Sequence, residues 1–329
     1  MRVFVCQYAA AAQFITDGWI NALNACGFDA RRWDGQINSW NAFNPDIYFG
    51  DPYYKQNFPK NTKTKIVIHA NPFGERLIPD PGNNDCNETQ EVIKWVVEQK
   101  PHLLWGYGNE HDIKRFWNKW TLKHGIPVIG MPTGGDAVIH YPVSKQPQYM
   151  FDISFIGGRW GYKAKNLDKY LLPVLNSARS AVWGWGGWDK MPFYKGKADN
   201  NNLNAIFSSA KVCPTIVEPH TTKYSVDMPE RIFKLGLCGA AIVSDPVFGL
   251  EHYYSNKAIK MATNPTQFKD YCMHFINNET DRIAHGKQVR LETLKNHTYF
   301  SRLQPLLRAL GFNKEADIMQ NKVNEISCI

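Results

Sequence analysis

The segment MPERIFKLGLCGAAIVSD at 228–245 combines residues that suit phosphate binding with a pattern that positions them. Pro229 fits the first turn of a helix, Gly239 fits its end, and AAIVSD is typical of a buried strand. A helix N-terminus offers free N–H groups and a positive dipole end to an anion. Glu230 is placed to accept hydrogen bonds from ribose hydroxyls, and Arg231 to meet phosphate. The segment predicts a nucleotide site, although a Glu/Arg pair also occurs at ordinary helix starts.

A second candidate phosphate site follows the apolar run DISFIG at 152–157. Gly157 and Gly158 let a backbone approach a phosphate closely, and Arg159 and Lys163 follow as cations. The stretch matches neither GxGxxG nor the P-loop pattern. The alternative is a tight turn with solvated cations.

The segment WGWGGWDK at 183–190 holds three Trp and three Gly in its first six residues. Such rings can border a base or sugar pocket, and Trp185 is the candidate for this role. Packing of the indoles in a domain core is the more common explanation.

Short β-rich runs alternate with helical segments, which predicts an α/β protein with parallel sheets and helices on both faces. The predicted strands are 2–6, 46–50, 65–70, 102–107, 127–131, 152–157, 181–186, 211–217, 240–245 and 258–262. The predicted helices include 15–27, 88–99, 167–178 and 265–277.

A polar segment with two Pro residues at 140–150 predicts a linker between two doubly wound halves. At roughly 100–200 residues per domain, the chain is long enough for two. We expect Rossmann-like domains at 1–145 and 146–310, and a final helix at 311–329 that packs back near the first domain. Ligands of such sheets bind outside the carboxyl ends of the strands, here in a cleft between the halves.

Positive charge is concentrated in the second half of the chain. The net charge is +8, and residues 151–329 hold 23 Lys and Arg against 16 Asp and Glu. The excess favours an anionic partner such as nucleic acid or a membrane surface, or simply a basic globular protein. No run of ~18 apolar residues occurs, so no membrane span is expected. Seven Cys without CxxC spacing favour reduced thiols in a cytoplasm.

Four segments follow one another as in a known family. DISFIGG, VWGWGGW, MPERIFKLGLCGAAIVSD and HTYFSRLQPLL (297–307) resemble the motifs of the spore-maturation CgeB-like glycosyltransferases, a group with the two-Rossmann-domain GT-B fold. The resemblance covers residues 127–310. The family positions in the last two motifs are Pro229, Arg231, Phe233, Cys238, Gly239, His297, Thr298, Tyr299 and Arg302.

The resemblance implies a glycosyltransferase that moves a sugar from a nucleotide sugar, by default a UDP-sugar, to an acceptor hydroxyl. It assigns the donor to the second domain and the acceptor to the first. No separate cofactor is implied. The predicted donor contacts are Gly157, Gly158, Arg159, Lys163, Trp185, Glu230, Arg231 and Lys234.

Lys234 departs from the family pattern, which has an acidic residue four places before Cys238. In GT-B enzymes that carboxylate commonly binds the donor ribose. Either Glu230, one turn earlier, takes this role, or the donor is held differently. No two Asp are spaced as DxD, so the metal-binding motif of the single-domain GT-A class is missing. We expect no metal, with cations and helix dipoles stabilising the leaving diphosphate.

Candidates for the catalytic base follow strands of the first half. Asp51 comes after DIYFG and His69 closes KIVIH. An inverting enzyme needs a carboxylate or an imidazole to deprotonate the acceptor, so Asp51 is the first choice and His69 the second. Each also has an ordinary structural explanation, and a retaining enzyme needs no such base. The predicted acceptor contacts are Tyr53, Tyr54, Lys55 and Asp136.

Aromatic and basic residues are interleaved at 52–65 and 114–124, a pattern that suits nucleic acid. The leading acceptor hypothesis is a hydroxymethylated base, such as hydroxymethylcytosine, in double-stranded phage DNA, because phage DNA glycosyltransferases share the GT-B architecture. A phage protein of this kind acts in the host cytoplasm. The competing acceptors are a cell-surface glycan and a lipid-linked sugar, and a solvated basic helix explains the pattern equally simply.

Two other classes of function remain. A non-catalytic nucleotide-sugar-binding protein would keep the fold, and Lys234 gives this alternative some weight. An epimerase or dehydrogenase needs GxGxxG after the first strand, where this chain reads CQYAAAAQF.

Overall fold

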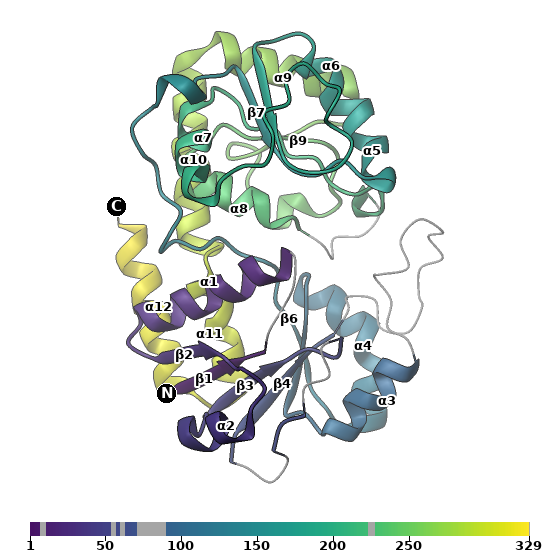
Figure 1. The fold of residues 1–329 in the computed structure, drawn as a ribbon, viewed down its shortest axis with the longest axis vertical. Helices are drawn as coiled ribbons and strands as arrows, with labels where there is room; N and C mark the ends of the chain where they lie inside the picture. Colours follow the sequence, from purple (N-terminus) through teal and green to yellow (C-terminus); the bar gives the residue numbers. More distant parts are fainter. Residues whose placement is uncertain (7–10, 54–56, 60–62, 71–89, 223–227, 329) are drawn as a thin grey trace. The chain divides into compact units, whose positions relative to one another are not determined.

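The computed structural model describes residues 1–6, 11–53, 57–59, 63–70, 90–222 and 228–328. The chain forms two compact units, each with its own core (Figure 1). Unit 1 comprises Met1–Val138, Val226–Met228 and Thr298–Ile329, and unit 2 comprises Ile139–Ser225 and Pro229–His297.

Unit 1 is built on a six-stranded sheet with the order β2-β1-β3-β4-β5-β6, in which every pair of neighbours is parallel. The strands are β1 (Arg2–Val5), β2 (Asp29–Arg32), β3 (Ile47–Gly50), β4 (Lys65–His69), β5 (Leu103–Gly106) and β6 (Val128–Gly130). The helices are α1 (Ala11–Ala25), α2 (Ile37–Phe43), α3 (Gln90–Gln99), α4 (Glu110–His124), α11 (Tyr299–Ala309) and α12 (Asn313–Ser327). The prediction of a parallel α/β sheet is confirmed. Only β2 was not predicted among these strands, because its sequence DARR has no apolar run.

Large aromatic side chains fill the core of unit 1. Trp19 of α1 contacts both Phe49 of β3 and Trp105 of β5. In Figure 1, α1, α11 and α12 lie on one side of the sheet, and α3 and α4 on the other. Tyr299 of α11 packs so closely on Gly18 that a Cβ there would overlap its ring. The C-terminal helices are therefore part of the core of unit 1.

Unit 2 is a smaller parallel sheet wrapped by helices. Its strands are β7 (Ile153–Ile156), β8 (Ser180–Trp183), β9 (Val243–Ser244) and β10 (Lys260–Met261), paired as β7–β8 and β9–β10. Isolated parallel bridges from Val212 to Ile153 and from Thr215 to Ser244 join these two ladders. The helices are α5 (Gly161–Asn166), a π-helical turn (Leu167–Leu171), α6 (Leu172–Leu175), α7 (Leu203–Ser209), α8 (Glu230–Leu237), α9 (Pro265–Asn277) and α10 (Glu279–Asn296).

The predicted strand at 211–217 forms only these bridges and no regular ladder. Pro214 lies in its middle and has no N–H group to donate to a neighbour, which accounts for the interruption. The predicted strand at 181–186 ends at Trp183, because Gly184 adopts a φ of 151° and turns the chain. The predicted helix at 167–178 is a π-helical turn followed by the short α6.

The main boundaries between the units are at 138/139 and 297/298, apart from the short segment Val226–Met228 that belongs to unit 1, whereas the sequence placed the boundaries at 145 and 310. The boundary at 297/298 precedes α11 for a local reason. Thr298 caps α11 by accepting a hydrogen bond from the Ser301 N–H, and Tyr299 donates its N–H to the carbonyl of Gly135 in unit 1. In the parts of the chain that the structure describes, no helix is long and apolar enough to cross a membrane.

Candidate functional site

Charged side chains gather at the carboxyl edge of the sheet in unit 2. Glu218 follows the bridge segment at 212–215, and Asp245 follows β9. Lys163 of α5 and Arg231 of α8 join them, and each of these cations interacts electrostatically with Glu218 and Asp245. This is the edge at which open α/β sheets bind ligands.

Lys163 is the centre of this cluster and is only 4% exposed. Its Nζ lies 3.3 Å from Oε1 of Glu218 and 4.9 Å from the ring centre of Trp160. Burial lowers the pKa of Lys163, and the nearby Arg231 lowers it further, while Glu218 opposes both effects. Two cations this close to each other can both contact one multiply charged anion.

Asp245 is fully buried and connects the elements that carry the cluster. Its Oδ2 accepts a hydrogen bond from Nδ2 of Asn166 at 3.2 Å, and its Oδ1 accepts one from the N–H of Val217 at 3.2 Å. Burial raises the pKa of Asp245 well above its ordinary value, and the hydrogen bond from Val217 opposes this effect. Asp245 thus ties α5 to the strand exit that bears Glu218.

Arg231 and Gly157, both predicted donor contacts, are brought together. A Cβ on Gly157 would lie 2.5 Å from Nη2 of Arg231, so a side chain at this position would displace the guanidinium from where it lies. The guanidinium carbon lies 4.7 Å from the centre of the Phe155 ring, whose face holds it in place. The glycine turn and the start of α8 therefore form one surface.

Trp185 and Gly158 also meet at this edge. Trp185 is 57% exposed and stacks on Trp160 with 5.2 Å between ring centres and 5° between planes. A Cβ on Gly158 would lie 2.6 Å from the Trp185 ring. Trp183 and Trp188 are buried, so two of the three indoles in the motif are core residues. The third is a rigid, exposed platform.

Three predicted donor residues besides Lys163 are engaged in ion pairs. Nη2 of Arg159 lies 2.9 and 2.7 Å from the two carboxylate oxygens of Asp168, which compensates its charge. Nζ of Lys234 lies 2.9 Å from Oε2 of Glu230, and both side chains are 15% exposed. Lys234, which departs from the family pattern, therefore pairs with Glu230, the residue expected to replace the missing acid.

Several motif residues have structural roles. Phe233 of α8 contacts His297 with 5.5 Å between ring centres, so two motifs far apart in the sequence pack together. Cys238 lies 3.4 Å from Oδ1 of Asn204, and burial raises its pKa to about 12. Gly239 has a φ of 69°, as expected after a helix end.

In unit 1, the two candidate bases contact each other. β3 and β4 pair with Gly50 opposite Ile68, so Asp51 and His69 follow at the same level of the sheet. Nδ1 of His69 lies 3.3 Å from Oδ2 of Asp51, and the two side chains are 8% and 5% exposed. Oδ1 of Asp51 accepts a hydrogen bond from the Tyr53 N–H at 2.7 Å. The sequence offered these residues as alternatives, whereas the structure joins them in one dyad.

Nε2 of His69 is the second nitrogen of this dyad. Both ring nitrogens are buried, and neither makes a hydrogen bond within the described residues, so Nδ1 lies 3.3 Å from Asp51 without hydrogen-bond geometry. The imidazole packs on Trp105 and Tyr107, which fix its orientation. An imidazole oriented by a carboxylate on one nitrogen can act as a base through the other.

The predicted acceptor contacts are dispersed. Tyr53 is exposed, while Tyr54 and Lys55 lie outside the described residues. Asp136 is 3% exposed and accepts hydrogen bonds from Nδ2 of Asn21 and the N–H of Val138, which is a structural role.

Sequence reasoning missed Glu218, Asp245 and Asn166 as site residues. Asp245 is the last residue of the segment 228–245, and its position directly after a predicted buried strand was a usable signal. Glu218 ends the apolar run before PHTT, a weaker signal. Asn166 became recognisable only from its contact with Asp245.

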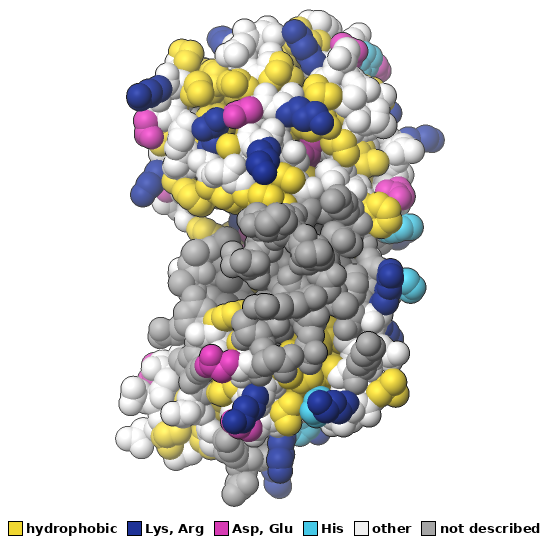
Figure 2. Space-filling view, turned by 90° about the vertical axis from the view of Figure 1, so that its right-hand side faces the viewer, with side chains coloured by type: hydrophobic (Ala, Val, Ile, Leu, Met, Phe, Trp, Pro, Cys, Tyr) yellow, Lys and Arg dark blue, Asp and Glu magenta, His cyan; other side chains and the backbone are white. Residues whose placement is uncertain are grey.

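The entire net charge of the chain belongs to unit 2. Unit 2 contains 20 Lys and Arg against 12 Asp and Glu, whereas unit 1 contains 18 of each. Figure 2 shows Lys and Arg side chains spread among hydrophobic ones on one face of unit 2, in its upper part. Within the described ranges, the structure has no cluster of His, Cys, Asp and Glu that could hold a metal ion, and the cysteines at 6, 26, 213, 238, 272 and 328 are free.

Comparisons with known proteins identify relatives of the fold. Residues 162–308 match the family model described as glycosyl transferase-like. The T4 phage β-glucosyltransferase superposes with a TM-score of 0.63 at 14% identity, over 96% of this chain and 100% of the other. The chain has the GT-B fold.

Two further structures support this assignment of the fold. Sucrose-phosphate synthase from Thermosynechococcus elongatus has a TM-score of 0.65 at 11% identity, over 94% of this chain and 99% of the other. HepE from Anabaena, in complex with UDP and glucose, has a TM-score of 0.60 at 8% identity over the same shares. No curated protein sequence matches the chain. The family match and the fold together support a glycosyltransferase enzyme.

Replacing Asp245 by Asn should make stability less dependent on pH. Burial raises the folded-state pKa of Asp245 above the unfolded value of about 3.9, so the folded state holds this proton more tightly. The contribution of Asp245 to stability is therefore full below the unfolded pKa and is lost as the pH rises through the folded pKa. The free energies of unfolding of the wild type and of Asp245→Asn are measured in urea. The value for the variant minus the value for the wild type should be larger at about pH 8 than at about pH 5.

The matched control is Asp189→Asn, which removes an exposed carboxylate from the same unit. It should change the free energy of unfolding equally at both pH values. An Asp245→Asn difference that is the same at both pH values would contradict the assignment.

Proposed function

We propose that this protein transfers a sugar from a UDP-sugar to an acceptor hydroxyl. The observation that carries the proposal is the pairing of buried Lys163 with Arg231 beside a glycine turn at the carboxyl edge of a parallel sheet. When a sugar leaves UDP, negative charge develops on the diphosphate. Preorganised cations in a buried site stabilise this charge better than water does.

The donor is held by groups that follow β7 and β8 and by the start of α8. Lys163 and Arg231 bind the diphosphate, and the Gly157–Gly158 backbone approaches it closely because neither residue has a side chain. Arg159 is not given this role, since Asp168 already compensates its charge. Trp185 offers its exposed face to a ring of the donor.

Glu230 binds the ribose hydroxyls. One of its carboxylate oxygens is paired with Lys234, and a carboxylate can accept up to about four hydrogen bonds. Lys234 then fixes the orientation of the carboxylate without replacing it. UDP is proposed because the Anabaena and T4 phage structures that share the fold contain UDP or UDP-glucose.

The Asp51–His69 dyad acts on the acceptor. Nδ1 of His69 faces Asp51, which leaves Nε2 to take the proton from the acceptor hydroxyl. The acceptor oxygen bonds to the anomeric carbon, the bond from that carbon to the diphosphate oxygen breaks, and UDP leaves with the electron pair. No metal takes part in this scheme.

The Lys163→Gln and Arg231→Gln variants should each bind UDP about tenfold to a hundredfold more weakly than the wild type. Each loses one charge-assisted hydrogen bond, worth about 1.5–3 kcal/mol, and about 1.4 kcal/mol corresponds to a factor of ten. Isothermal titration calorimetry with UDP measures the effect.

The control is Lys169→Gln, which removes an exposed ammonium that lies over the neighbouring Tyr170 ring. It should bind UDP as the wild type does. If Arg231→Gln bound UDP with unchanged affinity, the diphosphate assignment would be wrong.

We propose a hydroxymethylated base in double-stranded DNA as the acceptor. The T4 phage β-glucosyltransferase, which has the same fold, is described as a DNA modifying enzyme. The excess of cations in unit 2 supplies charge for DNA phosphates, and Lys114, Arg115 and Lys123 are exposed on α4 of unit 1. The free thiols suit a reducing cytoplasm, where phage DNA is modified.

Labelled UDP-glucose should transfer its sugar to hydroxymethylcytosine DNA and not to unmodified DNA. His69→Gln should abolish most of this transfer while leaving the UDP affinity unchanged, because it removes the base but no donor contact. Filter-bound radioactivity measures transfer, and DNA binding should weaken steeply as salt rises. If no donor among several UDP-sugars labelled this DNA, the DNA acceptor would be excluded, and labelling of a glycan or lipid extract would favour the competing acceptors.

A further inference from the structure

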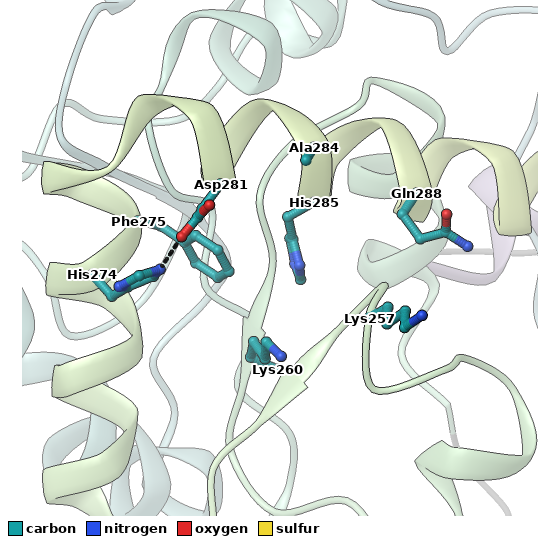
Figure 3. A pocket seen from close by; sticks show the side chains of 8 residues that line it. All are labelled: Lys257, Lys260, His274, Phe275, Asp281, Ala284, His285 and Gln288. Atoms are coloured by element: carbon teal, nitrogen blue, oxygen red, sulfur yellow. Dashed lines mark hydrogen bonds and ion pairs between the residues drawn. The ribbon is translucent and has the colours of Figure 1, made fainter.

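A second hollow lies in unit 2 between β10, α9 and α10, with a volume of about 410 Å³ (Figure 3). It lies at the opposite edge of the sheet from the cluster of Lys163, Glu218, Arg231 and Asp245. His285 in its wall lies with Nε2 3.1 Å from the carbonyl of Ile242, just before β9 begins, whereas Asp245 follows the end of β9. The lining residues are Lys257, Lys260, His274, Phe275, Asp281, Ala284, His285 and Gln288.

The charges around this hollow are unbalanced. In the described part of the chain, the ammonium groups of Lys257 and Lys260 have no ion-pair or hydrogen-bond partner. Asp281 is the one acidic residue of the lining, and it is 2.9 Å from Nε2 of His274. Figure 3 shows this pair to one side and the two lysines below α10. Two cations therefore face the hollow without a carboxylate committed to them.

The positive charge of Lys260 also acts on His285 in the wall of the hollow. Burial lowers its pKa to about 4, the carbonyl contact of Ile242 opposes this effect, and the charge of Lys260 lowers the pKa further. The imidazole is thus neutral at pH 7, and the ammonium of Lys260 acts on it without compensation.

We propose that this hollow binds a small molecule with a phosphoryl group. Lys257 and Lys260 would meet the phosphate oxygens as charge-assisted donors, and the volume falls within the range of about 300–1,000 Å³ that is typical of ligand sites. Lysine ammonium groups bind phosphate as point charges, without the fixed geometry that arginine imposes. The site is independent of the sugar-transfer reaction proposed above.

The helix α10, which lines the hollow, also packs closely on α8. A Cβ on Gly236 of α8 would overlap the Thr293 side chain of α10, and a Cβ on Gly286 of α10 would overlap the carbonyl oxygen of Gly239. The two helices are therefore packed without spare room.

The test uses inorganic phosphate as the probe and the full chain at pH 7, with ionic strength held constant by chloride. The NMR signals of the His285 imidazole are followed because this ring lies in the wall of the hollow and remote from the donor edge. We expect a saturable shift in the wild type. In the Lys257→Gln/Lys260→Gln variant, phosphate should bind at least about tenfold more weakly.

Two further variants separate the site from general electrostatics. Asp281→Asn removes the acid of the lining and should strengthen binding, whereas Lys287→Gln removes an exposed cation of α10 that is not part of the lining and should leave it unchanged. Arg231→Gln should weaken UDP binding but not this response, which separates the failure of one site from the failure of the other. The proposal is overturned if phosphate causes no saturable shift of His285, or if the double lysine variant responds as the wild type does.

Discussion

The burial of Lys163 against Glu218, Asp245 and Arg231 is the constraint around which unit 2 is organised. Moving a charge out of water costs several kcal/mol, and a buried ion pair seldom returns more than this cost. Two cations and two acids at one sheet edge therefore add little to stability. They are better explained by ligand binding than by stability, since Lys163 and Arg231 lie close enough together for one diphosphate to contact both. Gly157 leaves space for the Arg231 guanidinium, and Asp245 links the elements that hold Lys163 and Glu218.

The two units differ in their charge and in the reactive groups that they contain. Unit 2 holds the whole net charge of +8 and the buried cations, whereas unit 1 is neutral and holds the Asp51–His69 dyad. An imidazole oriented by a carboxylate suits removal of a proton, and clustered cations suit a leaving diphosphate. If DNA is the acceptor, most of the charge that attracts its phosphates comes from unit 2. The sequence predicted this excess in the second half of the chain, in addition to the basic aromatic segments of the first half.

The sequence predicted the α/β class, the parallel sheets and most strands, because apolar runs between helices are a direct signal of buried parallel strands. It missed β2, whose residues are polar, and it placed the second domain boundary after α11 because helical periodicity does not say which core a helix joins. Gly157 and Arg231 could each be predicted as donor contacts from their own motifs. Their contact with each other could not be predicted, because it depends on how strands distant in the sequence pair. The pairing of Lys234 with Glu230, and of Asp51 with His69, likewise needed three-dimensional positions.

A crystal structure with UDP tests the account most directly. The account predicts diphosphate oxygens within hydrogen-bond distance, about 2.7–3.2 Å, of Nζ of Lys163 and of the guanidinium of Arg231, with the ribose hydroxyls on Glu230. A diphosphate that contacts neither cation, or UDP bound elsewhere on the chain, would contradict it.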